Sequence, residues 1–281
     1  MGETIVKIAA VLTCFNRKDK TLNCIKKLMH QYKTIDIYVC DDGSTDHTSE
    51  AIKKKYPNVK VIQSNGGLFW SKGMFQGMKA AVTKDYDFYL MVNDDVDFYD
   101  NMLEIMLNSY ESANGNCSIV GSTQSSFSKK LTYGGSVLKT KLNINKKFLL
   151  SPTGKVQKCD FANWNCFLID KFTIDNVGLI DNAYEHGIGD FDYSCRMKKK
   201  NIPMYVATDY IGTCERNPIK NTFGDNELSI KKRLSLLLSA KGLPIKSSFR
   251  FYWKNYKIIG VPFLLWMYLR ILLSISLNKP C

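Results

Sequence analysis

The stretch Ile5–Thr13 reads Ile-Val-Lys-Ile-Ala-Ala-Val-Leu-Thr and runs into the polar segment Cys14–Arg17. An almost continuous apolar run of this length predicts a strand that is covered on both faces, as in parallel sheets. Apolar residues then recur at helical spacing, and Asp19 is placed to cap that helix. These residues are Leu22, Ile25, Leu28, Met29 and Tyr32. The opening of the chain therefore predicts a strand followed by a helix.

The same alternation continues along the chain, and the resulting βαβαβαβ order indicates a mostly parallel sheet wrapped by helices. The second half is less regular. Further strands are predicted at Ile35–Cys40, Val59–Gln63, Phe88–Val92, Phe161–Ile169 and Met204–Thr208. A further helix is predicted from the turn at Asp41–Asp46 to Tyr56, and another over Asp192–Lys200. Between them, a helix is predicted whose one face carries Trp70, Met74, Met78 and Ala81.

The composition is that of a folded protein, with 281 residues, 45% hydrophobic and 23% charged, which excludes a disordered or fibrous chain. The N-terminal residues show no basic start followed by an apolar run, so no signal peptide is expected. Nine scattered cysteines without a C-x-x-C pair indicate reduced thiols of a cytosolic protein.

The positive charge is concentrated at the C-terminal end. Residues 228–281 carry ten basic and no acidic side chains, whereas residues 1–227 carry 29 basic and 26 acidic ones. A basic segment that is also aromatic and apolar is typical of a surface that lies on anionic lipid. A solvated basic tail is the alternative, and nucleic acid is not expected because no recognition motif accompanies the charge.

The end of this tail, Ile258–Leu277, is twenty residues long and nearly all apolar, which is long enough to span a bilayer. Arg270 inside it costs about 2.5–3.5 kcal/mol at mid-membrane, and Pro262 interrupts its start. A helix lying in the membrane interface is therefore favoured over a span. A buried C-terminal helix or a homo-oligomer contact remains open.

Polar clusters follow the predicted strands, at the edge where open α/β sheets bind ligands. They are Thr13–Arg17, Asp41–Asp46, Asn65–Lys72 and Asn93–Asp95. The adjacent acids Asp94 and Asp95 repel each other unless a cation and bound phosphates lie there, or they form a solvated turn. No dinucleotide fingerprint and no Walker loop occurs, which argues against those two classes of enzyme.

Two further segments have a functional and a structural interpretation. Asn65–Met74 opens a helix with glycines, Trp70 and Lys72, which suits a phosphate or simply a packed helix start. Asp190 follows Gly189 where a loop enters a helix, so its carboxylate caps the helix or accepts a proton from a substrate hydroxyl. His186 is a metal ligand or a structural residue.

Together these clusters resemble the GT-A glycosyltransferases of family 2, over roughly Ile5–Asp209. The family's successive motifs correspond to Thr13-Cys14-Phe15-Asn16-Arg17, Asp41-Asp42-Gly43-Ser44, Asn65-Gly66-Gly67, Asn93-Asp94-Asp95 and Gly189-Asp190. The resemblance implies a GT-A (Rossmann-like) α/β fold plus a basic amphipathic C-terminal helical tail. It also implies a catalytic domain over 1–227, divided near residue 100 into nucleotide and acceptor halves, with 228–281 associating with membrane or with a second copy.

The resemblance also implies roles for individual residues. Asp190 would be the general base, and Asp95 would bind Mn²⁺ or Mg²⁺ on the diphosphate. The nucleotide side would comprise Thr13, Phe15, Asn16, Arg17, Asp42, Asn65, Gly67, Lys72 and Asp94. Asn163 and Trp164 would line the acceptor pocket, where Trp164 is expected to stack on a sugar face.

The chain departs from the family pattern at the metal motif, which begins with Asn93, and it lacks the family's histidine near Ile211–Glu215. It also lacks the Gln-x-x-Arg-Trp motif of processive synthases, which favours transfer of a single sugar. The implied function is inverting transfer from a UDP- or dTDP-sugar to a lipid-linked saccharide in bacterial surface polysaccharide (O-antigen or capsule) synthesis, at the inner face of the cell membrane. A sugar-nucleotide pyrophosphorylase and a non-catalytic sugar- or membrane-binding module are the alternatives.

Overall fold

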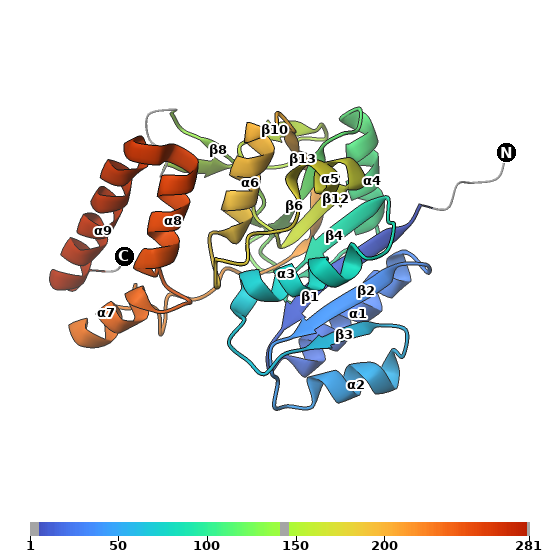
Figure 1. Ribbon diagram of the computed structural model, residues 1–281, viewed down its shortest axis with the longest axis horizontal. Helices are drawn as coiled ribbons and strands as arrows, with labels where there is room; N and C mark the ends of the chain where they lie inside the picture. The colour runs from blue at the N-terminus through green and yellow to red at the C-terminus, as the bar shows by residue number, and fades with distance from the viewer. Residues whose placement is uncertain (1–5, 141–145, 280–281) are drawn as a thin grey trace.

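The computed structural model describes residues 6–140 and 146–279, and Figure 1 shows the arrangement of its elements. Up to residue 124 the elements are β1 (Ile8–Cys14), α1 (Lys18–Gln31), β2 (Asp36–Asp41), α2 (Thr48–Lys55), β3 (Lys60–Gln63), α3 (Phe69–Ala81), β4 (Phe88–Val92), β5 (Asp97–Phe98), α4 (Met102–Ser112) and β6 (Ser118–Gln124). They are followed by β7 (Leu131–Tyr133), β8 (Gly135–Leu138), β9 (Lys147–Leu149), β10 (Gln157–Cys159), β11 (Phe161–Ala162), β12 (Cys166–Asp170), α5 (Lys171–Val177), α6 (Gly189–Lys199) and β13 (Met204–Thr213). The chain ends with α7 (Ile230–Leu238), α8 (Ile245–Tyr256), the 3-10 turn η1 (Lys257–Ile259) and α9 (Gly260–Ser276).

The central sheet has the strand order β10-β13-β6-β12-β4-β1-β2-β3. In addition, β5 pairs with β13 and β7 pairs with β6. Strands β1 to β4 pair in parallel, whereas β12 runs antiparallel between β4 and β6. A small second sheet has the order β11-β8-β9. Because β1, β2 and β4 are parallel, the polar segments that follow them meet at one edge of the sheet.

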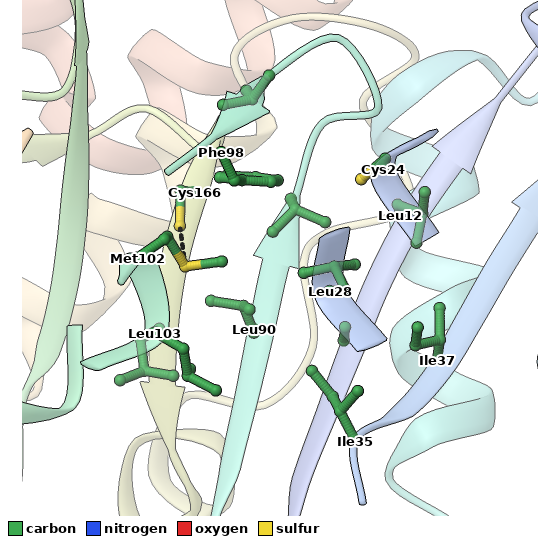
Figure 2. Close-up of a cluster of buried hydrophobic side chains, with 14 of the residues drawn as sticks. Leu12, Cys24, Leu28, Ile35, Ile37, Leu90, Phe98, Met102, Leu103 and Cys166 are labelled. Carbon is green, nitrogen blue, oxygen red and sulfur yellow. Dashed lines mark hydrogen bonds between the residues drawn. The ribbon is translucent and has the colours of Figure 1, made fainter. Parts of the chain in front are cut away.

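Helices cover both faces of the central sheet. On one face, Leu28 of α1, Ile52 of α2 and Met102 of α4 share one buried cluster with alternate residues of β1, β2 and β4, and the close-up in Figure 2 shows part of this cluster. On the other face, Met74 of α3 and Tyr193 of α6 pack against the remaining residues of the same strands. Burial on both faces explains why β1 reads as a continuous apolar run.

Several predicted boundaries are confirmed and others are wrong. Strand β4 coincides with the predicted Phe88–Val92, but β1 begins at Ile8, and the predicted start at Ile5 lies outside the described residues. Asp19 does not cap α1, because Arg17 holds the N-cap position and Asp19 lies in the first turn. The predicted strand Phe161–Ile169 is divided into β11 and β12, since residues 163–165 turn between two different sheets.

The C-terminal helices form a separate layer beside α6, with α8 and α9 folded against each other as a hairpin (Figure 1). The hydroxyl of Tyr268 in α9 donates a hydrogen bond to the carbonyl oxygen of Leu243 and lies 3.1 Å from the hydroxyl of Ser248 in α8. Pro262 lies in the first turn of α9 and does not interrupt it, because the first turn needs no backbone N–H from that residue. Within the described residues, Ile245–Ser276 is the one stretch long and apolar enough to cross a membrane by length and composition.

The prediction that the tail presents its basic residues to a surface does not hold for three of them. Arg233 is fully buried and bonds the carbonyl oxygens of Phe223 and Lys279. Lys254 binds Asp181 and Asp192, and Arg250 also binds Asp181. These three cations attach the tail to itself or to the rest of the protein and are not available to an anionic surface.

Candidate active site

Asp42 organises the start of helix α3. Its carboxylate accepts hydrogen bonds from the backbone N–H groups of Leu68 (2.9 Å) and Phe69 (2.8 Å), and from the hydroxyl of Ser64 (2.7 Å). A carboxylate satisfies the unpaired N–H groups of a helix start and lies favourably in the helix dipole. Asp42 was predicted on the nucleotide side, and its oxygens here are already engaged in positioning the loop that follows β3.

The loops after β1 and β2 are tied to each other. Asn16 has a positive φ of 51°, its backbone N–H donates to Ser44, and its side-chain oxygen accepts the backbone N–H of Thr45 at 2.7 Å. Gly43 lies so close to Gly66 that a Cβ on it would approach the Gly66 nitrogen to 2.8 Å. The polar motifs after β1, β2 and β3 therefore form one packed edge.

Arg17 joins this edge to the acids that follow β4. Its Nη1 lies 2.8 Å from Asp94 Oδ1 and 3.1 Å from Asp95 Oδ2. Asp94 also accepts a hydrogen bond from Thr21, and burial raises its pKa, an effect that Arg17 opposes. The guanidinium supplies the positive charge that two neighbouring carboxylates require. Arg17 was predicted to contact the nucleotide, and the structure shows it paired with these acids.

The residues present fit a divalent cation whose coordination is completed by a diphosphate. Asp95 Oδ1 is buried and has no hydrogen-bond partner among the described residues, so one carboxylate oxygen is available. The described residues contain no group of three His, Cys, Asp or Glu side chains that would hold a metal by themselves. Mg²⁺ and similar hard cations are commonly held by one or two carboxylates together with substrate phosphates.

Asn93 links the acids that follow β4 to Asn165, in the turn between β11 and β12. Its Oδ1 accepts a hydrogen bond of 2.8 Å from the indole of Trp70, and its Nδ2 donates to Asn165 Oδ1 at 2.9 Å. The backbone N–H of Asn93 also donates to the Asn165 carbonyl. The substitution of Asp by Asn at this position thus provides a donor that a carboxylate lacks.

Asp190 lies at the start of α6, and its carboxylate accepts the backbone N–H of Phe191 at 2.8 Å. Burial raises its pKa to about 6, and the opposing contributions come from that N–H, from Lys147 and from the backbone of Trp164. A buried carboxylate with a pKa close to neutrality suits a general base.

Two aromatic residues connect Asp190 to the metal motif. Trp164, whose backbone helps to lower the pKa of Asp190, lies edge-on to Trp70 with ring centroids 6.0 Å apart. Trp70 in turn bonds Asn93. Residue 189 also packs against Ser71, the next residue of α3. A series of contacts through Trp164 and Trp70 thus links Asp190 to the motif that carries Asp94 and Asp95.

The prediction that Trp164 stacks on a sugar is not supported. Its indole is fully buried, is stacked on Phe167 and lies edge-on to Tyr193. Asn163 is half-buried and accepts the backbone N–H of Asn165, which stabilises the turn between β11 and β12. Trp164 therefore acts on the site through its backbone and through Trp70.

The remaining predicted residues lie along the same edge. Thr13 packs against Gly73 of α3, where a Cβ would lie 2.5 Å from its hydroxyl. Phe15 is 52% exposed, so its ring is accessible at this edge. Asn65 and Gly67 are in the turn before α3, and Gly67 has a φ of 85°. Lys72 lies in the first turns of α3 and forms no ion pair with the described residues.

Two further residues near the site, Asn165 and His186, have weak signals in the sequence. Asn165 contacts Asn93 twice, and its only signal was the repeated amide in Asn163-Trp164-Asn165. His186 lies edge-on to Phe69 and its buried Nδ1 has no partner among the described residues. Burial, together with the charges of Lys241 and Arg17, lowers the pKa of His186. It is a neutral imidazole close to the site.

Comparison with known proteins identifies the family. The model of "Glycosyl transferase family 2" matches residues 9–171, which include every motif up to β12. The chain belongs to glycosyltransferase family 2. This membership excludes the pyrophosphorylase alternative. A curated relative of this family-2 enzyme, an uncharacterized glycosyltransferase of Rickettsia conorii, is 34% identical over 112 residues. That match covers 38% of this chain and only 18% of the relative.

Solved structures share the fold of this glycosyltransferase. The mannosyltransferase PcManGT from Pyrobaculum calidifontis, in complex with GDP-Man and Mn²⁺, has a TM-score of 0.58 at 10% identity, covering 98% of this chain and 74% of its own. S. aureus TarS 1–349 has a TM-score of 0.55 at 14% identity, covering 96% and 81%. Its complex with UDP has a TM-score of 0.52 at 16% identity, covering 92% and 71%. The mixed α/β fold with a mostly parallel sheet is thus the GT-A fold that the motifs implied.

Proposed function

We propose that this enzyme transfers one sugar, with inversion, from a UDP- or dTDP-sugar to a hydroxyl of a lipid-linked saccharide in bacterial surface polysaccharide synthesis. The single observation that carries the proposal is the placement of Asp190. Its buried carboxylate is connected, through the contact of Trp164 with Trp70 and the hydrogen bond of Trp70 to Asn93, to the motif that carries Asp94 and Asp95. A base on one side and a pyrophosphate-binding edge on the other is the arrangement that a single displacement requires.

On the acceptor side, Asp190 removes the proton from the attacking hydroxyl as the new glycosidic bond forms. Its pKa of about 6 leaves it ionised at pH 7 while keeping it basic enough to accept that proton. The bond from the anomeric carbon to the diphosphate oxygen breaks as the acceptor oxygen attacks from the opposite face. One displacement of this kind inverts the anomeric configuration.

On the donor side, the packed edge made by the loops after β1, β2 and β3 would receive the nucleoside, with exposed Phe15 beside the base. Asp95 would hold a divalent cation, Mn²⁺ or Mg²⁺, which neutralises charge on the departing diphosphate. Lys72 would contact a phosphate from the start of α3, where the helix dipole also favours an anion. The donors named for PcManGT and TarS, GDP-Man and UDP, are of the same chemical class.

On the membrane side, the C-terminal hairpin would place the enzyme on the inner face of the cell membrane. Its outward faces carry large exposed apolar side chains, among them Phe249, Trp253, Leu265 and Trp266. Exposed cations such as Lys246 and Lys257 flank them. An aromatic, apolar and basic surface suits an anionic lipid interface. A second copy of the chain is the other occupant that this surface allows.

The test combines a donor screen with two variants. Sugar nucleotides are screened by thermal shift with and without Mn²⁺, and transfer is then measured on a lipid-linked saccharide extract. We expect Asp190→Asn to abolish transfer while nucleotide affinity stays within about two-fold, and Asp95→Ala to weaken metal-dependent UDP binding. Undiminished transfer by Asp190→Asn, or equal UDP binding by wild type with and without Mn²⁺, would contradict the assignment.

A further inference from the structure

A pocket of about 270 Å³ opens between the start of α6, strand β9 and the C-terminal hairpin. Its apolar walls include Ile188 and Phe191, the neighbours of Asp190, and Trp266 of α9. The α/β part of the chain and the C-terminal hairpin therefore both contribute to the pocket. A ligand that fills it lies next to the segment that carries the proposed base.

Three cations line this pocket, namely Lys146, Lys147 and Arg270. None of them forms an ion pair in the part of the chain that the structure describes. The cations of the same hairpin that face α6 behave differently, because Arg250 and Lys254 are paired with Asp181. Apart from the charge of Asp190 near Lys147, the positive charge of the pocket is not balanced by an ion pair with the described residues, which favours an anionic ligand.

Lys147 is held over aromatic rings at the side nearest to Asp190. Its Nζ lies 3.9 Å from the ring centroid of Phe191 and 4.7 Å from that of Phe161. Its desolvation by the surrounding protein lowers its pKa, and the charge of Asp190 opposes that effect. A cation fixed in this way can bind a phosphate with little further loss of side-chain freedom.

Arg270 lies on an otherwise apolar face of α9. Its neighbours on that helix, Trp266, Leu269 and Leu273, are all exposed. Arginine is well suited to a phosphate because its planar guanidinium donates two parallel hydrogen bonds. An apolar strip beside a phosphate-binding cation matches an amphiphile whose anionic head and hydrocarbon chain are joined.

We propose that this pocket binds the phosphate through which a lipid-linked acceptor is attached to its hydrocarbon chain. Lys146, Lys147 and Arg270 hold the phosphate, the chain lies along the exposed apolar face of α9, and the saccharide extends past Phe191 towards Asp190. This inference rests on the proposed function and adds to it the site and the chemical group that select the acceptor.

The experiment measures binding of octyl phosphate, below its micellar concentration, to the full chain by isothermal titration. We expect Arg270→Gln to weaken binding at least ten-fold, and Lys147→Gln to do the same. Lys231→Gln removes an exposed charge from α7, outside the pocket, and should change affinity less than two-fold. Equal affinity of Arg270→Gln and wild type for octyl phosphate would overturn the proposal.

Two further probes separate the source of the anion. Inorganic phosphate and the neutral amphiphile octyl glucoside should each bind at least ten-fold more weakly than octyl phosphate. Equal binding of inorganic phosphate would reduce the pocket to a site for free phosphate and refute the lipid assignment. Equal binding of octyl glucoside would refute the phosphate assignment.

Failure of the proposed function is recognised separately, from UDP binding with Mn²⁺ on the same samples. If UDP does not bind to wild type but octyl phosphate binding depends on Arg270, the donor assignment fails and the pocket stands. If UDP binds normally and the affinity for octyl phosphate is the same in wild type, Arg270→Gln and Lys147→Gln, the pocket assignment fails and the donor assignment stands.

Discussion

The indole Nε1 of Trp70 lies 2.8 Å from Oδ1 of Asn93, and this hydrogen bond joins the start of helix α3 to the motif that carries Asp94 and Asp95. Trp70 also packs edge-on against Trp164, whose backbone helps to lower the pKa of Asp190. One side chain thus contacts both the motif after β4 and the residue next to Asn163 in the turn between β11 and β12. The relationship depends on an N–H donor, which only some aromatic residues have.

Replacement of Trp70 by Phe should therefore disturb both sides of the site. Asn93 would lose its donor in a partly buried position, which costs about 1–3 kcal/mol of unfolding free energy. We expect a lower melting temperature and weaker binding of UDP with Mn²⁺, measured by thermal shift and titration. Trp253→Phe, at an exposed position of α8, is the control and should alter neither. Unchanged UDP binding by Trp70→Phe would show that the link is not needed.

The pH dependence of transfer should follow Asp190. Because its pKa is about 6, the rate should be nearly constant above pH 7 and fall about ten-fold per unit below pH 6. The initial rate at saturating donor, measured between pH 4.5 and 8.5, provides the check. A rate that stays flat down to pH 5 would exclude this carboxylate as the base.

The raised pKa of Asp190 also predicts that Asp190→Asn, which should lose activity, gains stability. The folded-state pKa is raised above the unfolded value of 3.8, so the stabilisation by the protonated form is lost as the pH rises from about 4 to 6. Asp190→Asn removes this loss and should be more stable than wild type at pH 7–8, by at most about 3 kcal/mol. Chemical denaturation of the two proteins at pH 7.5 tests this, and a less stable variant would contradict it.

Arg17 should matter most when no cation is bound. Without its guanidinium, Asp94 and Asp95 lose their charge partner, which costs about 1–3 kcal/mol. Arg17→Gln should melt at a lower temperature than wild type in EDTA, and addition of Mn²⁺ with UDP should raise that temperature by more than it does in wild type. Lys20→Gln, at an exposed position on α1, is the matched control. An equal effect of Mn²⁺ and UDP on Arg17→Gln and wild type would contradict the view that Arg17 and the cation balance the charge of the same two acids.

Asp42 should contribute to stability as well as to the donor site. Asp42→Ala leaves the N–H groups of Leu68 and Phe69 without an acceptor, and we expect a loss of about 2–4 kcal/mol. Ser64→Ala removes just one of the three bonds and should cost about 1 kcal/mol. Urea denaturation without nucleotide measures both. A stable Asp42→Ala variant that fails to bind nucleotide would restore the direct role predicted from the motif.

Attachment of the hairpin should weaken in acid. The side-chain hydrogen bonds from Lys254 and Arg250, together with the backbone N–H of Ala183, outweigh the burial of Asp181 and lower its pKa to about 2. Because this value is depressed, its stabilisation is present above about pH 4 and lost as the pH falls from 4 to 2. Asp181→Asn should expose the amides of α8 to hydrogen exchange at pH 7, whereas Asp175→Asn should not. Equal exchange of α8 in the two variants would contradict the prediction.

The sequence predicted the fold of the first half well, because each buried strand is followed by polar residues and then by a helix with a regular apolar face. Its predictions were weaker after residue 100. The segment Phe161–Ile169 reads as one apolar strand, but residues 163–165 turn so that β11 joins the small sheet and β12 enters the central one. Hydrophobicity alone does not record which sheet a short apolar segment joins.

By itself, the sequence determined which chemical groups are available and in what order they follow the strands: Asp42, then Asp94 and Asp95, then Asp190. Tertiary structure decided how these groups are used, because partners distant in sequence compete for the same atoms. It committed Asp42 to the start of α3, placed Arg17 between two acids and buried Trp164 in the core. It also paired Arg250 and Lys254 of the tail with Asp181 and Asp192, and it left Arg270 at an open pocket.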